Sequence, residues 1–177
     1  MNYFFVKNLK RNVGTVLALF LLLFFDQYTK RLAVIHLKDQ SSFVLIDRVL
    51  EFSYLENTGA AFSSFAGRQT FLILLTSMVI LVVIWKYFTL PAEKRFAGMR
   101  IGLLFIAGGA VGNLIDRITQ QYVVDFNYFV PIDFPKFNVA DIYITIGVAL
   151  LAVLLFFYYN DEEFEALLAI RQKHADK

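Results

Sequence analysis

Four long apolar blocks divide this sequence, and they constrain its fold more than any other feature. A helix needs about 20 apolar residues to cross a hydrocarbon core of about 30 Å, and each block has about that length. The chain is 58% hydrophobic and only 18% charged, against about 25% charged residues in a soluble domain. We therefore predict an all-α polytopic membrane protein with four transmembrane helices: Val13 to Ile35, Gln69 to Tyr87, Ile101 to about Ile118, and Val139 to Tyr159.

The distribution of Lys and Arg predicts the orientation of these helices. Cytoplasmic loops of membrane proteins carry an excess of both residues. We therefore expect both termini and the loop between the second and third blocks in the cytoplasm. The start resembles a signal peptide, but no small-residue cleavage site follows, so the first block is expected to be retained. Residues 1–160 should form one membrane domain, and residues 161–177 a polar cytoplasmic tail. The residues concerned are Lys7, Lys10 and Arg11 in the N-terminal segment and Lys86, Lys94, Arg95 and Arg100 in the loop.

The two segments expected on the outer side differ in character. Two short apolar runs, Phe43–Ile46 and Leu50–Leu55, flank a turn at Asp47-Arg48 and predict a β-hairpin. A lone two-stranded ribbon is marginally stable, so we expect it to lie on the membrane or on the helices. The second segment is rich in aromatic residues, which favour the membrane interface, and is expected to form a short interfacial helix or loop. Its aromatic residues are Tyr122, Phe126, Tyr128, Phe129 and Phe134.

The expected topology brings polar residues from distant parts of the chain to the outer membrane face. A carboxylate at the margin of a bilayer is costly to keep, so its default interpretation is functional. No comparable set is expected on the inner face. The converging residues are Asp26, Asn57, Asn113, Asp116, Arg117, Asp125, Asn138 and Asp141.

Some of these residues have a structural interpretation. Asp26 and Lys30 are four residues apart on one helix face, and we favour a neutralised pair over a catalytic one. Small residues at Gly108, Gly109 and Gly112 allow another helix to approach closely. For Asp116 we favour a tight helix contact capped by an ion pair with Arg117, whose side chain would reach the interface. Asn113 and Arg117 are expected to support the site.

Asp125 and Asp141 are different, because neither has a Lys or Arg within four residues. Asp133 shares the second outer segment with Asp125, but it stands between two prolines, where a carboxylate is normally solvated. Asp141 follows Asn138 at a helix start, where capping is the simpler explanation. Two close carboxylates cannot both ionise and share one proton, which is the arrangement of an aspartic acid–base pair. Which of the two holds the shared proton is open from sequence.

Other chemistries are excluded by composition. The chain has no Cys and only two His, so thiolate catalysis is absent, a Ser-His site is not expected, and no HExxH or other histidine metal site is present. A net charge of +2 without a basic cluster does not indicate nucleic-acid binding. A small proton- or ion-coupled transporter is the alternative, but its acids should lie near mid-bilayer, and internal repeats are expected.

Five short motifs in order resemble those of the lipoprotein signal peptidase (signal peptidase II) family. They cover the chain from the first apolar block to the fourth. Each motif is short, but the five motifs in this order are specific to the family. In this sequence they stand as Asp26-x-x-x-Lys30, Asn57-x-Gly-Ala-Ala-Phe62, Gly112-Asn-Leu-Ile-Asp-Arg117, Val124-Asp-Phe126 and Phe137-Asn-Val-Ala-Asp141.

The resemblance implies an aspartic endopeptidase of the bacterial cytoplasmic (inner) membrane. It would remove the signal peptide from diacylglyceryl-modified prolipoproteins, cutting before the lipidated cysteine, with Asp125 and Asp141 as catalytic residues. The first outer segment would match the family's β-cradle and the second its periplasmic helix. Membrane lipids and cyclic peptide antibiotic inhibitors are further implied partners, and no cofactor or metal is expected. The residues implied to support the site or bind substrate are Asn57, Gly59, Asn113, Asp116, Arg117, Asn138, Asp26 and Lys30.

Overall fold

The computed structural model describes residues 3–59, 65, 67–91 and 93–168, without the side chains of 3–11, 166 and 168. Its four long helices contain the membrane spans, at residues 12–37, 69–89, 94–120 and 139–158. The four spans predicted from the sequence are therefore confirmed, with boundaries within a few residues except at the start of the third. The helices are α1 (Tyr3–Leu37), α2 (Gln69–Thr89), α3 (Ala97–Gln120, after a 3-10 turn η2 at Lys94–Phe96) and α4 (Val139–Val153, continued by a π-helical turn η4 at Leu154–Tyr158).

Helix α3 is the centre of the bundle and contacts α1, α2 and α4. Its glycines make these contacts close. A methyl group on Gly112 would collide with Asp26 Oδ2 of α1, and one on Gly109 would collide with the carbonyl oxygen of Ala140 in α4. The small residues predicted to mediate helix packing therefore do so, and they bring α1 and α4 against the same stretch of α3.

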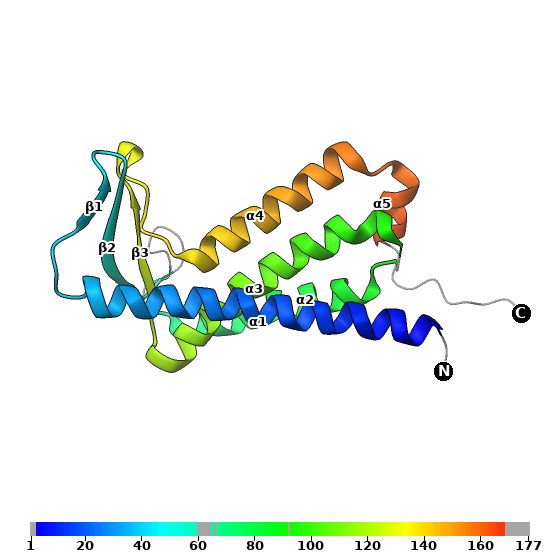
Figure 1. Cartoon of the computed structure of the whole chain (residues 1–177), viewed down its shortest axis with the longest axis horizontal. Helices are drawn as coiled ribbons and strands as arrows, with labels where there is room; N and C mark the ends of the chain where they lie inside the picture. The colour runs from blue at the N-terminus through cyan, green and yellow to red at the C-terminus, as the bar shows by residue number, and fades with distance from the viewer. Residues whose placement is uncertain (1–2, 60–64, 66, 92, 169–177) are drawn as a thin grey trace, which may run out of the picture.

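Three antiparallel strands form a sheet in the order β1-β2-β3 at one end of the bundle (Figure 1). The predicted hairpin is confirmed as β1 (Phe43–Ile46) and β2 (Leu50–Asn57). The helix or loop expected in the second outer segment, residues 121–138, is wrong for Val123–Phe129, which form the third strand, β3. One 3-10 turn, η3 (Val130–Ile132), follows the strand. The run of β-branched and aromatic residues in β3 was a strand signal, and pairing with β2 satisfies its backbone.

One face of the sheet packs on the end of α1. Phe126 of β3 and Phe52 of β2 contact each other edge to face, with ring centroids 6.2 Å apart, and belong to a hydrophobic cluster that includes Ala33 of α1. Side chains alternate between the faces of a strand. Asp125, the neighbour of Phe126, therefore projects from the opposite face.

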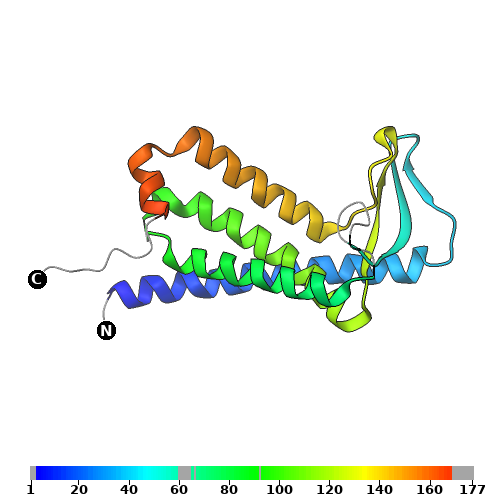
Figure 2. The same ribbon diagram turned by 180° about the vertical axis from the view of Figure 1, so that it is seen from behind.

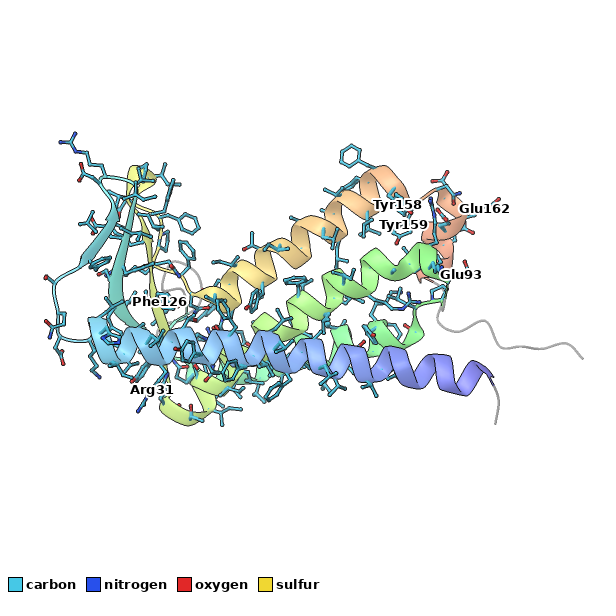
Figure 3. All side chains as sticks on the ribbon, in the orientation of Figure 1. Arg31, Glu93, Phe126, Tyr158, Tyr159 and Glu162 are labelled. Atoms are coloured by element: carbon cyan, nitrogen blue, oxygen red, sulfur yellow. The ribbon has the colours of Figure 1, made fainter. Side chains whose placement is uncertain are left out.

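The other end of the bundle is closed by a short helix, α5 (Asp161–Leu168). Figure 3 shows Tyr158 and Tyr159 beside α5, at the opposite end of the molecule from Phe126. Leu167 of α5 is buried against α2 and α3, and Glu163 accepts two hydrogen bonds from Arg95, at 2.5 and 3.0 Å. The segment expected to be a polar tail thus begins as a helix docked on the bundle, and residues 169–177 lie outside the described residues.

Candidate active site

Polar side chains from β2, β3, α3 and the start of α4 meet where the sheet joins the helices. Figure 2 shows this junction from behind as a ribbon. Asp125 in β3 accepts hydrogen bonds from Nδ2 of Asn57, at the end of β2 (2.8 Å), and from Nδ2 of Asn138 (2.6 Å). Asp141 in the first turn of α4 accepts from Asn113 Nδ2 of α3 (2.8 Å) and from the backbone N–H of Asn138 (3.0 Å). Asn138 therefore bridges the two aspartates whose pairing the sequence predicted.

The orientation of each of these asparagine amides is determined by a group that can only donate. The Asn138 oxygen accepts the Asp141 N–H (3.1 Å), the Asn57 oxygen accepts the Gly59 N–H (2.9 Å), and the Asn113 oxygen accepts from the Lys30 ammonium (2.9 Å). The NH₂ group of each amide must then point the other way, toward an aspartate. The two aspartates are thus surrounded by donors, and a carboxylate is the form that donors favour.

Lys30 lies at the base of this network and is only 3% exposed. Its Nζ is 2.9 Å from Asp26 Oδ2 and 3.0 Å from Asp116 Oδ2, in addition to its contact with Asn113. The ammonium therefore has an acceptor for each of its three N–H groups. The expected Asp26–Lys30 pair is present, and it belongs to a buried group of three charges.

Asp26 and Asp116 also hold the backbone of the two segments that carry Asp125 and Asp141. Asp26 Oδ1 accepts the N–H of Ala140 (3.0 Å), the residue before Asp141. Asp116 Oδ2 accepts the N–H of Val124 (3.3 Å), the residue before Asp125. The buried ion pairs that Lys30 makes with Asp26 and Asp116 thus set the position of β3 relative to α4.

Asn138 has a second role as the N-cap of α4. It forms a capping box with Asp141, in which each side chain accepts from the other residue's backbone N–H. The capping predicted for this helix start is confirmed, and the same contacts orient Asp141.

Arg117 and Gly59 connect the turn after β2 to the same network. Arg117 NH2 donates to the carbonyl oxygen of Gly59 (3.2 Å), and Gly59 in turn donates its N–H to Asn57. Arg117 is 8% exposed, and its Nε has no hydrogen-bond partner among the described residues. The rest of this motif, Ala60 to Phe62, lies outside the described residues.

Two expectations about this region are corrected. Asp116 pairs with Lys30 of α1 and not with Arg117. Arg117 does not extend to the interface, because its side chain is buried and donates to the carbonyl oxygen of Gly59. Sequence reasoning also overlooked Gln27, whose Nε2 donates to Asp116 (3.0 Å) and Asp26 (3.1 Å). The sequence did contain a signal for this residue, because a glutamine next to an aspartate within an apolar helix is costly to keep unless it has a partner.

Asp133 lies apart from this network. It is exposed, and its Oδ1 accepts a hydrogen bond from the Tyr128 hydroxyl at 2.6 Å.

Burial separates Asp125 from ordinary aspartates. Its side chain is 1% exposed. Burial, and next the negative charge of Asp141, raises the pKa of Asp125 to about 7, although the hydrogen bonds from Asn57 and Asn138 lower it. Asp141 is only half-buried. At neutral pH a proton is therefore available on Asp125 beside a second, more solvated carboxyl group.

Comparisons with known proteins identify the family. The family model described as signal peptidase (SPase) II matches residues 18–157. A lipoprotein signal peptidase of Clostridium novyi is 41% identical over 133 residues, covering 73% of this chain and 88% of that protein. One from Geobacillus kaustophilus is 38% identical over 140 residues, covering 78% and 90%.

A solved structure has a similar fold. A structure described as a bacterial membrane enzyme superposes with a TM-score of 0.71 at 30% identity, covering 82% of this chain and 94% of that one. These matches give no support to a transporter. The chain belongs to the signal peptidase II family, and it is a multi-pass bacterial membrane peptidase.

Proposed function

We propose that this peptidase removes signal peptides from prolipoproteins with Asp125 and Asp141 as an aspartic catalytic pair. The family match supports signal-peptide removal. The observation that carries the catalytic assignment is the bridge made by Asn138, which donates from its side chain to Asp125 and from its backbone to Asp141. Two carboxyl groups held through one residue, in a site lined by donors, have the arrangement that acid–base hydrolysis of a peptide requires.

The two aspartates have different roles. Asp125 is the acid, because its raised pKa of about 7 lets a large fraction of this carboxyl group hold a proton near neutral pH. Asp141 is the base, because it is the more solvated carboxyl and lies in the first turn of α4, where the helix dipole stabilises its anion.

The proposed reaction balances with these two groups alone. Asp141 takes a proton from water as the water oxygen attacks the scissile carbonyl carbon. Asp125 gives its proton to the carbonyl oxygen, and a tetrahedral gem-diol forms. Asp141 then passes its proton to the amide nitrogen while Asp125 takes back a hydroxyl proton, so that the C–N bond breaks and both aspartates return to their starting states.

The substrate is proposed to be a prolipoprotein that carries a diacylglyceryl-modified cysteine, cut just before that residue. The two aspartates lie at the sheet end of the four spans, so a signal peptide lying along the helices would present its end to them. We place both termini in the cytoplasm and this site at the outer face, because the basic loop between α2 and α3 lies at the opposite end of the bundle from the sheet, where Figure 3 labels Glu93.

A purified-enzyme assay tests the proposal. The enzyme is given one prolipoprotein with and without its diacylglyceryl group, and release of the signal peptide is followed. We expect cleavage of the lipidated form alone. Equal cleavage of both forms would contradict the substrate class, and no cleavage of either would contradict the function.

A further inference from the structure

The turn that follows β2 carries Asn57, one of the two side-chain donors to Asp125. The other donor, Asn138, is held as the N-cap of α4. Asn57 is the last residue of β2, and its own side-chain oxygen accepts the N–H of Gly59 (2.9 Å). The direction of the Asn57 amide therefore depends on the conformation of the turn at Thr58 and Gly59.

Gln69, the first residue of α2, holds this turn from 11 residues farther along the chain than Thr58. Its Nε2 donates to the carbonyl oxygen of Thr58 at 2.6 Å, and the residue is only 9% exposed. The N–H of Gly67 donates to the same oxygen at 3.2 Å. Arg117 of α3 donates to the next carbonyl oxygen, that of Gly59. Two consecutive carbonyl groups of the turn are thus held by side chains from two different helices.

The side-chain amide of Gln69 is costly to bury. Its Oε1 has no hydrogen-bond partner among the described residues, and an unsatisfied buried polar atom is unfavourable. The residues that follow it in α2 are mostly apolar, so an apolar side chain would be the ordinary choice at the start of this span. The contact that accounts for a glutamine at this position is its hydrogen bond to the carbonyl oxygen of Thr58.

We propose that Gln69 is a positioning residue for the catalytic step. By holding the carbonyl group of Thr58, it fixes the turn in the conformation that points the Asn57 NH₂ group at Asp125. In this role it acts through Asn57 and needs no contact with the substrate. Gln69 lies outside the five sequence motifs that resemble the family. This role rests on the proposed function, because it affects catalysis only if Asp125 is the acid.

The proposed role has a consequence for the proton on Asp125. Burial raises the pKa of Asp125, and the hydrogen bond from Asn57 opposes this rise because it favours the carboxylate form. If the turn relaxes, this hydrogen bond weakens and the pKa of Asp125 rises further. Gln69 is hydrogen-bonded to Thr58, so a change at Gln69 reaches Asp125 through the turn. The other charged groups that face Asp125 are Asp141 of α4, Lys30 of α1 and Arg117 of α3.

The pH–rate profiles of purified Gln69→Met and Asn57→Ala enzymes, measured on a diacylglyceryl-modified prolipoprotein, test this role. Methionine keeps the length of glutamine and removes the N–H donor. Because each change weakens the donor to Asp125, the descending limb should move to higher pH in both variants. We expect a shift of about one pH unit in Asn57→Ala and a smaller one in Gln69→Met. The double variant should shift no further than Asn57→Ala alone, since both changes act on the same hydrogen bond.

The matched control is Thr70→Val, a change at the exposed neighbour of Gln69 in α2, and its descending limb should stay in place. An unmoved limb in a folded Gln69→Met protein would overturn the role of Gln69, whatever its melting temperature. An equal shift in Thr70→Val would overturn it too. If Gln69→Met does not fold, Gln69→Asn takes its place with the same expected shift, because its side chain is one methylene too short to hold Thr58.

These outcomes separate the role of Gln69 from the catalytic proposal. If Asn57→Ala shifts the descending limb while Gln69→Met does not, the catalytic pair stands and the role of Gln69 fails. If Asn57→Ala does not shift the limb, the limb does not belong to Asp125, and the acid role of Asp125 fails together with the role of Gln69.

Discussion

The Nζ of Lys30 lies 2.9 Å from Oδ1 of Asn113, and through this contact a buried ammonium decides which way an active-site amide points. Because the Asn113 oxygen is held by Lys30, its NH₂ group is left for Asp141, to which it donates at 2.8 Å. The charge that neutralises Asp26 and Asp116 therefore also orients the amide that donates to Asp141, the proposed base. Under the proposed mechanism, the stability of the fold and the catalytic step depend on the same lysine.

Replacement of this lysine should be strongly destabilising. Lys30→Met leaves the carboxylates of Asp26 and Asp116 buried without their counter-ion, and breaking a buried charge group costs about 3–5 kcal/mol. The matched control is Lys38→Met, whose exposed pair with Glu56 should be worth about 0–1 kcal/mol. Thermal unfolding of the purified proteins in detergent measures both. Equal stability of the two variants would contradict the buried network.

The catalytic pair predicts a contrast between aspartates. Asp125→Asn and Asp141→Asn should each abolish turnover of a prolipoprotein, since acid and base are both required. Asp133→Asn should keep near-normal activity, because Asp133 is exposed and its carboxylate accepts a hydrogen bond from Tyr128, outside the network of Asp125 and Asp141. Single-turnover cleavage with the purified variants, together with substrate binding to the inactive ones, provides the measurement. An active Asp125→Asn variant or an inactive Asp133→Asn variant would sink the assignment.

The pH dependence of activity follows from the acid role of Asp125. This group must be protonated, so activity should fall as pH rises through its pKa of about 7. The proposed mechanism also needs an unprotonated base, so activity should fall again at low pH. A pH–rate profile on a lipopeptide measures both limbs. The descending limb should persist in a His36→Gln, His174→Gln double variant, and its loss there would assign it to a histidine instead.

The same carboxyl group should make stability depend on pH. The folded pKa of Asp125, about 7, is raised above the value of about 3.9 in an unfolded chain. The folded state therefore binds the proton more tightly, and its contribution to stability is full below about pH 4 and is lost as pH rises to about 7. Melting temperatures measured between about pH 5 and about pH 8 should show this decline, with a smaller slope in Asp125→Asn. Identical slopes would show that Asp125 does not titrate in this range.

Helix contact at Gly112 can be tested by adding one methyl group. Gly112→Ala places a carbon against Asp26 Oδ2, whereas Gly14→Ala meets nothing within 4 Å. We expect the first change to cost about 1–3 kcal/mol, as overpacking does, and the second to be neutral or stabilising. Thermal unfolding in detergent compares the two. A Gly112→Ala protein as stable as the Gly14→Ala protein would contradict the close approach of α1 and α3.

The orientation in the membrane is open to a direct experiment. Reporter domains fused after Pro91 should be cytoplasmic, because the basic residues of this loop favour that side. Reporters inserted near Ser42 should be on the outer side, with the sheet. A reporter after Pro91 found on the outer side would reverse the proposed placement of Asp125 and Asp141.

Properties that depend on local composition could be predicted from the sequence. The four spans follow from apolar length, the hairpin follows from two short runs around a turn, and the Asp26–Lys30 pair follows from helical spacing. The meeting of distant polar residues at one end of the bundle followed from the number of spans, because alternate helices run in opposite directions. Each of these predictions depends only on residues close together in the sequence or on the thickness of the bilayer.

Partners that lie far apart in the chain were decided by tertiary structure. The aromatic residues of Val123–Phe129 are typical of a membrane interface. The segment forms a strand because β2 supplies hydrogen-bond partners for its backbone N–H and C=O groups. Asp116 pairs with Lys30, not its neighbour Arg117, because the glycines of α3 let α1 approach. The direction of each amide beside Asp125 and Asp141 depends on a donor from another element. Sequence determines which groups are present, whereas packing determines which donor meets which acceptor.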